Sequence, residues 1–286
     1  HFADVARVIV GIMNLKIFAF GPRPQDFYAC NAPIKPFFDL GMKVMENSEL
    51  DMYKAYKEAA DRTGEIEAVR KEMEDELGDG NRYPEKLKEL AQFEVALSHF
   101  MDENLGSCRF GVFANKCWPA FQPMFGFTPC YVNSRFASRG IPVACEVDMY
   151  VALSQYMLVC ASRQPATLLD LNNTCPPDMP LGDLKGAARE DLFMGFHCGN
   201  TPAAMLCEGC AMKHQLIMHR LMEPDAKPNI TCGTLEGTLK PGPMTLFRLQ
   251  STPGCELRSY LAQGHVLEAD PNSFGAIGTI AIPDFA

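Results

Sequence analysis

The 286-residue sequence has no apolar run long enough to cross a membrane. Its longest run, Met149 to Ala161, is short and is interrupted by Ser154 and Gln155, whereas a spanning helix needs about 20 apolar residues. No leader peptide is visible at the start of the sequence. Lysine and arginine form no basic stripe of the kind that binds nucleic acid. These absences predict a protein whose partners include neither membrane nor nucleic acid.

Positive charge is scarce in one long segment. Residues 46–103 carry 17 acids and 8 bases, while the other residues balance, so this segment accounts for the whole net charge of −9. Its hydrophobic residues follow a helical period, which favours a pair of solvated surface helices. Ser48, with Glu49 and Asp51 in the turn that follows, predicts the start of the first one.

The sequence also lacks the cysteine pattern of a small disulfide scaffold. Its 12 cysteines are scattered along the chain in apolar settings such as Val159-Cys160-Ala161, which favours reduced thiols in a cytoplasmic protein. Cys207, Cys210 and His214 have the spacing of half a zinc site, but the other half is missing. We favour a helix in which these three residues share one packed face over structural zinc.

Strands and helices alternate up to about residue 161. We expect helices at residues 2–15, 31–42 and 148–161, and strands at residues 16–20, 43–45, 109–114 and 141–145. This alternation predicts an α/β domain with a doubly wound parallel sheet, Rossmann-like, over residues 1–161. Ligands of such sheets bind beyond the carboxyl ends of the strands, where Cys145 and Glu146 fall.

The pattern changes after residue 161. We expect short strands at residues 167–171, 233–237, 244–249, 256–262 and 278–282, with one helix at residues 203–221. Such spacing predicts a mainly antiparallel, β-barrel-like domain over residues 162–286. Both ends of the chain look cut, so we expect a fragment with a truncated barrel. Thr279–Ala286 would then be an edge strand or a disordered tail that promotes self-association.

Two acids interrupt the apolar stretch Ile141–Tyr156. Glu146 and Asp148 stand at its centre, and a buried carboxylate is costly unless a cation or several donors satisfy it. Asp170 follows Glu146 by 24 residues, so a helix out and a strand back can bring the two together. A hard divalent cation between them is one interpretation. Glu146 capping a helix and Asp170 capping a turn is the other.

Seven motifs in order resemble the L-fucose/L-arabinose isomerase family over nearly the whole chain. They are Phe20-Gly-Pro-Arg-Pro-Gln-Asp-Phe27, Val44-Met-Glu-Asn-Ser-Glu-Leu50, Cys117-Trp-Pro-Ala-Phe-Gln122, Cys145-Glu-Val-Asp148, Leu168-Leu-Asp-Leu-Asn-Asn173, Gly195-Phe-His-Cys-Gly-Asn-Thr-Pro202 and Thr234-Leu-Glu-Gly237. In that family a middle α/β domain ends just after a glutamate metal ligand, and a C-terminal β-barrel domain begins with an aspartate ligand. Glu146 and Asp170 match these two positions, and Asp148, which has no match, is expected to be an acid of a helix first turn.

The resemblance implies a ketol isomerase that converts an aldose (L-fucose, L-arabinose or a related sugar) into its ketose through a metal-bound ene-diol. Glu146 and Asp170 would bind Mn²⁺ and would also be the candidate catalytic bases. The third metal ligand, a histidine, would lie beyond this chain. The candidate substrate-binding residues are Trp118, Gln122, Asn172, His197 and Asn200. Each has a structural alternative: Trp118 and His197 as core residues, and the three amides as turn formers.

The resemblance further implies a homo-oligomer, a hexamer or trimer, with sites shared between subunits, so this fragment is expected to be an incomplete enzyme. Direct metal ligation by His197 is a further alternative. His99, His214 and His219 are expected to be structural or at the surface. Two rival functions remain: a non-catalytic sugar-binding or regulatory protein of the same fold, and a thiol enzyme that uses Cys145 or Cys198 with His197.

Overall fold

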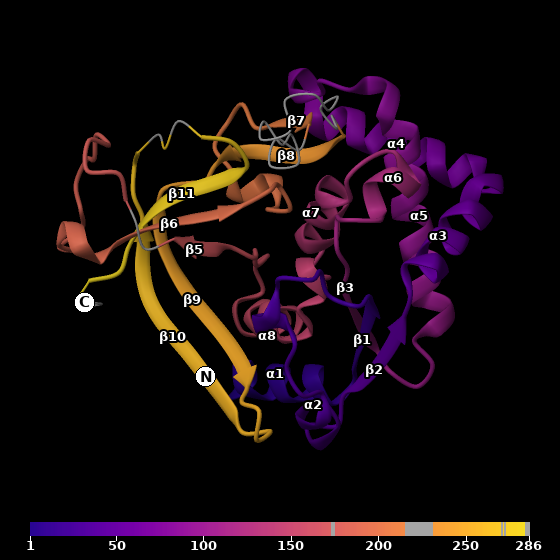
Figure 1. The fold of residues 1–286 in the computed structure, drawn as a ribbon, viewed down its shortest axis with the longest axis horizontal. Coiled ribbons are helices and arrows are strands. Elements are labelled where there is room, and N and C mark those ends of the chain that lie inside the picture. Colours follow the sequence, from indigo (N-terminus) through magenta and orange to yellow (C-terminus); the bar gives the residue numbers. More distant parts are fainter. Residues whose placement is uncertain (173–174, 215–230, 270, 272, 284–286) are drawn as a thin grey trace.

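The computed structural model describes residues 1–172, 175–214, 231–269, 271 and 273–283. Two separate sheets organise these residues: a parallel sheet of four strands and a mainly antiparallel sheet of seven (Figure 1). The expected mixed α/β architecture is therefore confirmed. The elements of the first part are α1 (Phe2–Met13), β1 (Leu15–Phe20), α2 (Lys35–Asp39), β2 (Lys43–Asn47), α3 (Glu49–Glu58), α4 (Thr63–Leu77), α5 (Leu87–Asn104), β3 (Phe110–Ala114), α6 (Phe121–Phe125), α7 (Cys130–Ser138), β4 (Val143–Ala144) and α8 (Met149–Ser162).

The four strands of the first sheet pair in the order β2-β1-β3-β4, all parallel. Successive side chains of a strand point to opposite faces, and β1 is apolar on both. Leu15 and Ile17 pack with residues of α8, while Phe18 and Phe20 pack on the other face with residues of α5. The sheet is therefore covered by helices on both sides, and its strand ends form the edge where polar residues can gather.

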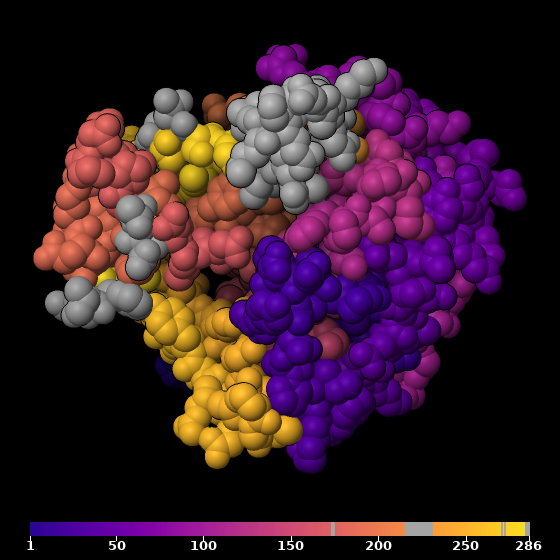
Figure 2. Space-filling model, in the orientation of Figure 1, coloured from indigo at the N-terminus to yellow at the C-terminus, as the bar shows by residue number. Residues whose placement is uncertain are grey.

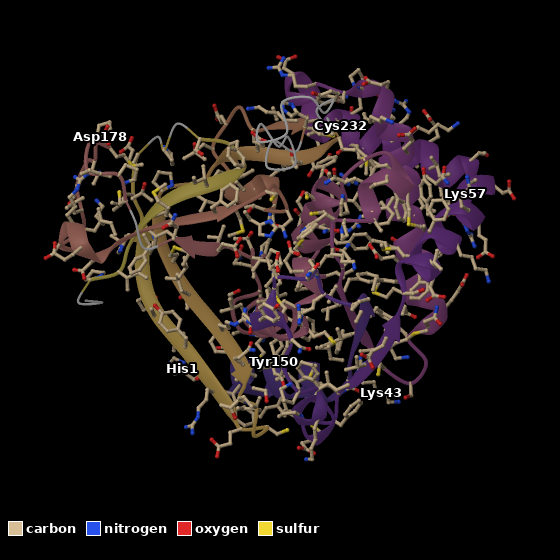
Figure 3. All side chains as sticks on the ribbon, in the orientation of Figure 1. His1, Lys43, Lys57, Tyr150, Asp178 and Cys232 are labelled. Carbon is tan, nitrogen blue, oxygen red and sulfur yellow. The ribbon has the colours of Figure 1, made fainter. Side chains whose placement is uncertain are left out.

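The acidic segment folds as three helices, α3, α4 and α5, and Ser48 caps the first as expected. Asp51 N donates to Ser48 Oγ, and Ser48 N donates to Asp51 Oδ2, forming a capping box. The expectation of a pair of solvated helices is wrong in number, and one acid of the segment is not solvated. Glu94 of α5 is only 1% exposed because Arg135 of α7 pairs with it at 2.6 Å. Lys57 marks the outer, solvated edge of these helices in Figure 3.

The second sheet runs in the order β5-β6-β11-β10-β9, with β8 also pairing with β11, and β7 with β8. Its strands are β5 (Asp170–Asn172), β6 (Leu192–His197), β7 (Ala211–His214), β8 (Cys232–Thr238), β9 (Gly242–Ser251), β10 (Leu257–Val266) and β11 (Ala276–Ala281). Within the described residues these strands close no barrel. The expected edge strand at Thr279 is also wrong, because β11 is paired with β6 on one side and β10 on the other. Residues 284–286 lie outside the described part.

Two expected helices differ from the structure. The helix expected at residues 31–42 shrinks to α2, because Pro36 is tolerated only in a first turn and Gly41 takes a left-handed φ of 82°. The helix expected at residues 203–221 is wrong in its described part. Gly209, with φ 85°, makes a turn there, and a strand, β7, follows it. Residues 215–221, including His219, lie outside the described part of the chain.

Helix α8 joins the two parts of the molecule. Leu249 N of β9 donates to Ser154 Oγ of α8 at 2.8 Å, and Tyr150 of α8 lies where the end of β9 reaches the α/β part (Figure 3). A cavity of about 640 Å³ lies between α8, the segment that leads into β5, and β9. Figure 2 shows a recess where the orange β9–β10 hairpin meets the indigo N-terminal segment. None of the described helices has the length and hydropathy required to span a bilayer.

Candidate active site

Glu146 stands at the carboxyl edge of the parallel sheet in a strained turn. It follows β4 in a 3₁₀ turn, Cys145–Val147, where Glu146 has φ 60° and Val147 has φ 55°. A β-branched residue in the left-handed region is a genuine outlier, and such strain collects at functional sites. Val147 N donates to Asn115 O at 2.9 Å, and Asp148 N donates to Cys145 O at 3.1 Å, which hold the turn in place.

Glu146 is half-buried, and its carboxylate is only half satisfied. Cys145 Sγ donates to its Oε1 at 3.4 Å, whereas Oε2 is buried with no hydrogen-bond partner among the described residues. Burial, followed by the charges of Cys117 and Asp170, raises the pKa of Glu146 to about 8. An orphaned carboxylate oxygen next to further ionisable groups fits a site that holds a cation or moves a proton.

Asp170 and His197 come from neighbouring strands of the second sheet. Asp170 begins β5 and pairs in register with Phe196 of β6, beside His197 at the end of that strand. Asp170 is exposed, while His197 is 4% exposed and its Nδ1 has no partner among the described residues. Burial lowers the pKa of His197, and the Asp170 carboxylate opposes that shift. Asp170 thus acts electrostatically on both Glu146 and His197, and the separation of about 5 Å between the two carboxylates stays a prediction.

A group of thiols lies beside Glu146 that sequence reasoning missed. Cys117, Cys130 and Cys145 form one buried cluster, and Cys117 Sγ, Cys145 Sγ and a Glu146 carboxylate oxygen all lie within 4.8 Å of one another. Hydrogen bonding with Cys117, together with burial, raises the pKa of both the Cys130 and the Cys145 thiols. The sequence did contain one indication of this group: Cys117 and Cys145 each follow a strand of the parallel sheet. The carboxyl ends of these two strands lie at the same edge of the sheet.

Of the remaining expected substrate-binding residues, Trp118 alone is seen to pack against this cluster. Asn200 is buried, and its Oδ1 has no hydrogen-bond partner in the part of the chain that the structure describes. Asn172 ends β5 at an exposed position. Gln122 is buried, and Thr231 Oγ1 donates to its Oε1. Contact of these side chains with a sugar stays a prediction.

Asp148 has a structural role, close to the one expected. It is the N-cap of α8 rather than a first-turn residue: Val151 N donates to Asp148 Oδ1 at 3.0 Å. Arg248 Nη2 of β9 donates to Asp148 Oδ2 at 2.8 Å. Asp148 is therefore satisfied although it is 6% exposed, which leaves Glu146 as the acid whose burial needs another explanation.

The other histidines and the expected half zinc site contribute no second metal group in the described residues. Cys207 and Cys210 lie around the turn before β7, not on a helix, and with His214 they do not converge on one point. His214 Nδ1 lies 3.5 Å from Tyr83 Oη. His99 Nε2 forms a surface pair with Glu65 at 2.7 Å, as expected of a structural or surface residue.

A known family model matches the C-terminal part of the chain. Residues 195–286 match the family model described as L-fucose isomerase, C-terminal domain. The chain resembles the L-fucose isomerase family. That match includes His197 and Asn200 and covers two of the seven sequence motifs, and it confirms the resemblance to this family.

Curated relatives extend the similarity to the α/β part. The chain is 28% identical over 249 residues to a sulfoquinovose isomerase of Alkalicoccus urumqiensis, covering 85% of this chain and 49% of the relative. It is 26% identical over 276 residues to one of Priestia megaterium, covering 93% and 54%. A third, of a Clostridium species, is 23% identical over 286 residues, covering 99% and 58%. The chain thus spans about half the length of the curated relatives it matches.

Proposed function

We propose that this chain is part of a metal-dependent aldose–ketose isomerase in which Glu146 is both a metal ligand and the catalytic base. The observation that carries the proposal is the Glu146 carboxylate itself: it sits on a strained turn, and its Oε2 is buried with no hydrogen-bond partner among the described residues. Neither a cap nor an ion pair of the described residues accounts for it, in contrast to Asp148. The likeness to L-fucose isomerase and to proteins named sulfoquinovose isomerase supports the reaction class.

The donor set fits a divalent cation. Glu146 and Asp170 offer carboxylate oxygens, which hard cations such as Mn²⁺ prefer. The orphaned Glu146 Oε2 is the atom of this chain that a cation would satisfy. When bound, the metal would supply Lewis acidity that polarises the sugar carbonyl. His197, with a buried and unpartnered Nδ1, would line the site or contact the sugar.

The chain's own residues would carry the proton. Aldose–ketose conversion removes a proton from carbon 2 and returns it to carbon 1, and a positioned carboxylate can do both. The raised pKa of Glu146 makes it a stronger base than an ordinary glutamate once it is ionised. Trp118 would offer an apolar face to the sugar, while Gln122, Asn172 and Asn200 would bind its hydroxyl groups.

The relatives' names point to the first substrate to test. We propose sulfoquinovose because the three compared relatives are named sulfoquinovose isomerase, with L-fucose and L-arabinose as the next candidates. We also propose that the whole protein assembles as a trimer or hexamer, as the family resemblance implies. Sedimentation of the full-length protein at micromolar concentration tests this, and a monomer would contradict it.

The function is tested on the full-length protein. Chelation should abolish ketose formation from the preferred sugar, and Mn²⁺ should restore it. Binding of the sugar without any conversion in the Mn²⁺-loaded protein would contradict the isomerase and favour a sugar-binding protein of the same fold. Loss of activity on thiol alkylation, with no effect of a chelator, would instead favour a thiol enzyme using Cys145 or Cys198.

A further inference from the structure

Two thiols and a carboxylate converge at the carboxyl edge of the parallel sheet. Cys117 Sγ, Cys145 Sγ and a carboxylate oxygen of Glu146 lie within 4.8 Å of one another; we call these three residues the thiol–carboxylate cluster. Among the described residues this is the one group of three or more metal-ligating side chains that meets so closely. The two strands that lead to it, β3 and β4, are paired side by side, so the backbone presents the ligands together.

The spacing is close to that of a tetrahedral metal site. Two thiolates bound to one zinc ion at about 2.3 Å lie about 3.8 Å apart, and a thiolate and a carboxylate oxygen lie about 3.5 Å apart. Cys145 Sγ and Glu146 Oε1 are already 3.4 Å apart. Small side-chain rotations would therefore complete the coordination, without movement of the sheet.

The burial of the cluster and the state of one carboxylate oxygen favour a bound ion. Cys117 and Cys145 are 3% and 2% exposed, and Glu146 Oε2 has no partner among the described residues. A buried carboxylate oxygen without a hydrogen bond calls for an unseen partner, a water or an ion. The cluster is lined by Cys130, Trp118 and Leu168, which would limit the access of water.

We propose that the thiol–carboxylate cluster binds a thiophilic divalent ion, with Zn²⁺ as its type. Three protein ligands with an open fourth position is the arrangement of many zinc sites that also take water or a ligand. On binding, each thiol gives up its proton to solvent and the sulfur lone pair forms the bond to the metal, with no change of oxidation state. Sulfur ligands select zinc over Mn²⁺ or Mg²⁺, which prefer oxygen.

The site would make Zn²⁺ and Mn²⁺ competitors for one carboxylate. Glu146 belongs both to this cluster and to the proposed Mn²⁺ centre, so occupation by zinc would withdraw it from that centre. Zinc binding itself does not rest on the proposed isomerase function. It can therefore be measured without any sugar, and its failure would leave the isomerase proposal untouched.

The test is a Co²⁺ titration of the metal-free, full-length protein under reducing conditions. Thiolate ligation gives cobalt an intense sulfur-to-metal charge-transfer absorption in the near ultraviolet. We expect this absorption in the wild type at one Co²⁺ per chain, with displacement by one Zn²⁺. Cys117→Ser and Cys145→Ser should each weaken it strongly. Cys232→Ser, a buried cysteine outside the cluster, should keep it.

A second measurement uses the wild type alone, so it tests the proposal even if the cysteine variants fail to fold. In the wild type, Zn²⁺ should protect Cys117 and Cys145 from a small methylthiolating reagent by about 100-fold at about 100 times its Kd, while the reaction of Cys232 stays unchanged. Peptide mass analysis reads out each site separately. Absence of the cobalt absorption in the wild type, or equal modification of Cys117 and Cys145 with and without Zn²⁺, would overturn the proposal.

Discussion

Arg248 Nη2 of β9 donates a hydrogen bond to Asp148 Oδ2, the N-cap of α8, at 2.8 Å. The pair joins the antiparallel sheet to the helix that follows the candidate site. Two residues earlier, Glu146 has no such partner for its Oε2. The two acids of one apolar stretch thus differ: Asp148 is satisfied by its cap and its ion pair, and Glu146 is the acid to which we assign the proposed chemistry.

Asp148→Ala should destabilise the protein without removing the proposed chemistry. Loss of the cap and of the Arg248 pair should cost about 1–3 kcal/mol in the free energy of unfolding by urea. A double-mutant cycle with Arg248→Met should show a coupling energy of at least about 0.5 kcal/mol. Arg258→Met is the matched control, because the ion pair of Arg258 with Glu256 is exposed. This substitution should change the free energy of unfolding little. Additive effects of Asp148→Ala and Arg248→Met would refute the link.

Glu94→Gln should be among the most destabilising single changes in the α/β part. Glu94 is 1% exposed and binds Arg135 at 2.6 Å and Arg139 at 2.5 Å. The substitution removes the most buried of the three acids that pair with Arg135, while Glu72 and Glu76 remain beside it, so the loss of these charged hydrogen bonds should cost about 1.5–3 kcal/mol. Glu67→Gln, which breaks an exposed pair with Arg70, should change the free energy of unfolding little, because water and salt screen such a pair. Equal unfolding midpoints for the two variants would contradict the assignment.

The metal-free protein should lose stability relative to Glu146→Gln as the pH rises. The pKa of Glu146 is raised from 4.5 to about 8, chiefly by burial. The folded state therefore holds a proton that the unfolded state gives up. This stabilising contribution is fully present below pH 4.5 and is lost as the pH rises through about 8. Urea unfolding of both proteins at several pH values tests it, and a constant difference between them would contradict the raised pKa.

Asp170→Asn should separate function from stability. Asp170 is exposed, so the substitution should change the free energy of unfolding of the protein by less than about 0.5 kcal/mol. As a proposed metal ligand, its loss should weaken Mn²⁺ binding by at least about tenfold, measured by calorimetry on the full-length protein. Asp178→Asn, another exposed acid, should bind Mn²⁺ normally. Wild-type affinity in Asp170→Asn would remove Asp170 from the proposed centre.

Local sequence signals predicted much of the first part and several later strands. The Ser48 cap, the strand that became β1 and the helix that became α8 were confirmed, because capping residues and hydrophobic periodicity act within a few neighbours. The sequence also placed Glu146 at the end of a strand. The predictions of a barrel, of an edge strand at Thr279 and of a helix from residue 203 were wrong. Strand partners come from distant segments, and tertiary pairing overrides local propensity.

The thiol–carboxylate cluster could not be predicted without knowing the strand order of the parallel sheet. Cys117 and Cys145 are 28 positions apart in the sequence, and nothing local links them. Only the pairing of β3 with β4 brings their strand ends together. Strand β6 gave no clear sequence signal either, because Gly195 interrupts its apolar pattern. Glycine is needed there, since a Cβ at this position would lie 2.5 Å from Ile280 Cδ1.

Deuterium exchange tests most directly whether Glu146 carries the proton in a metal-dependent isomerisation. The full-length, Mn²⁺-loaded protein is incubated with sulfoquinovose, L-fucose or L-arabinose in heavy water, and carbon 1 of the ketose is followed by nuclear magnetic resonance. The account predicts that the wild type forms ketose from one of these aldoses, with exchange at carbon 1. Glu146→Gln, folded and metal-loaded, should be slower by at least about 10²–10⁴-fold. Ketose formation and exchange by Glu146→Gln at the wild-type rate would contradict it.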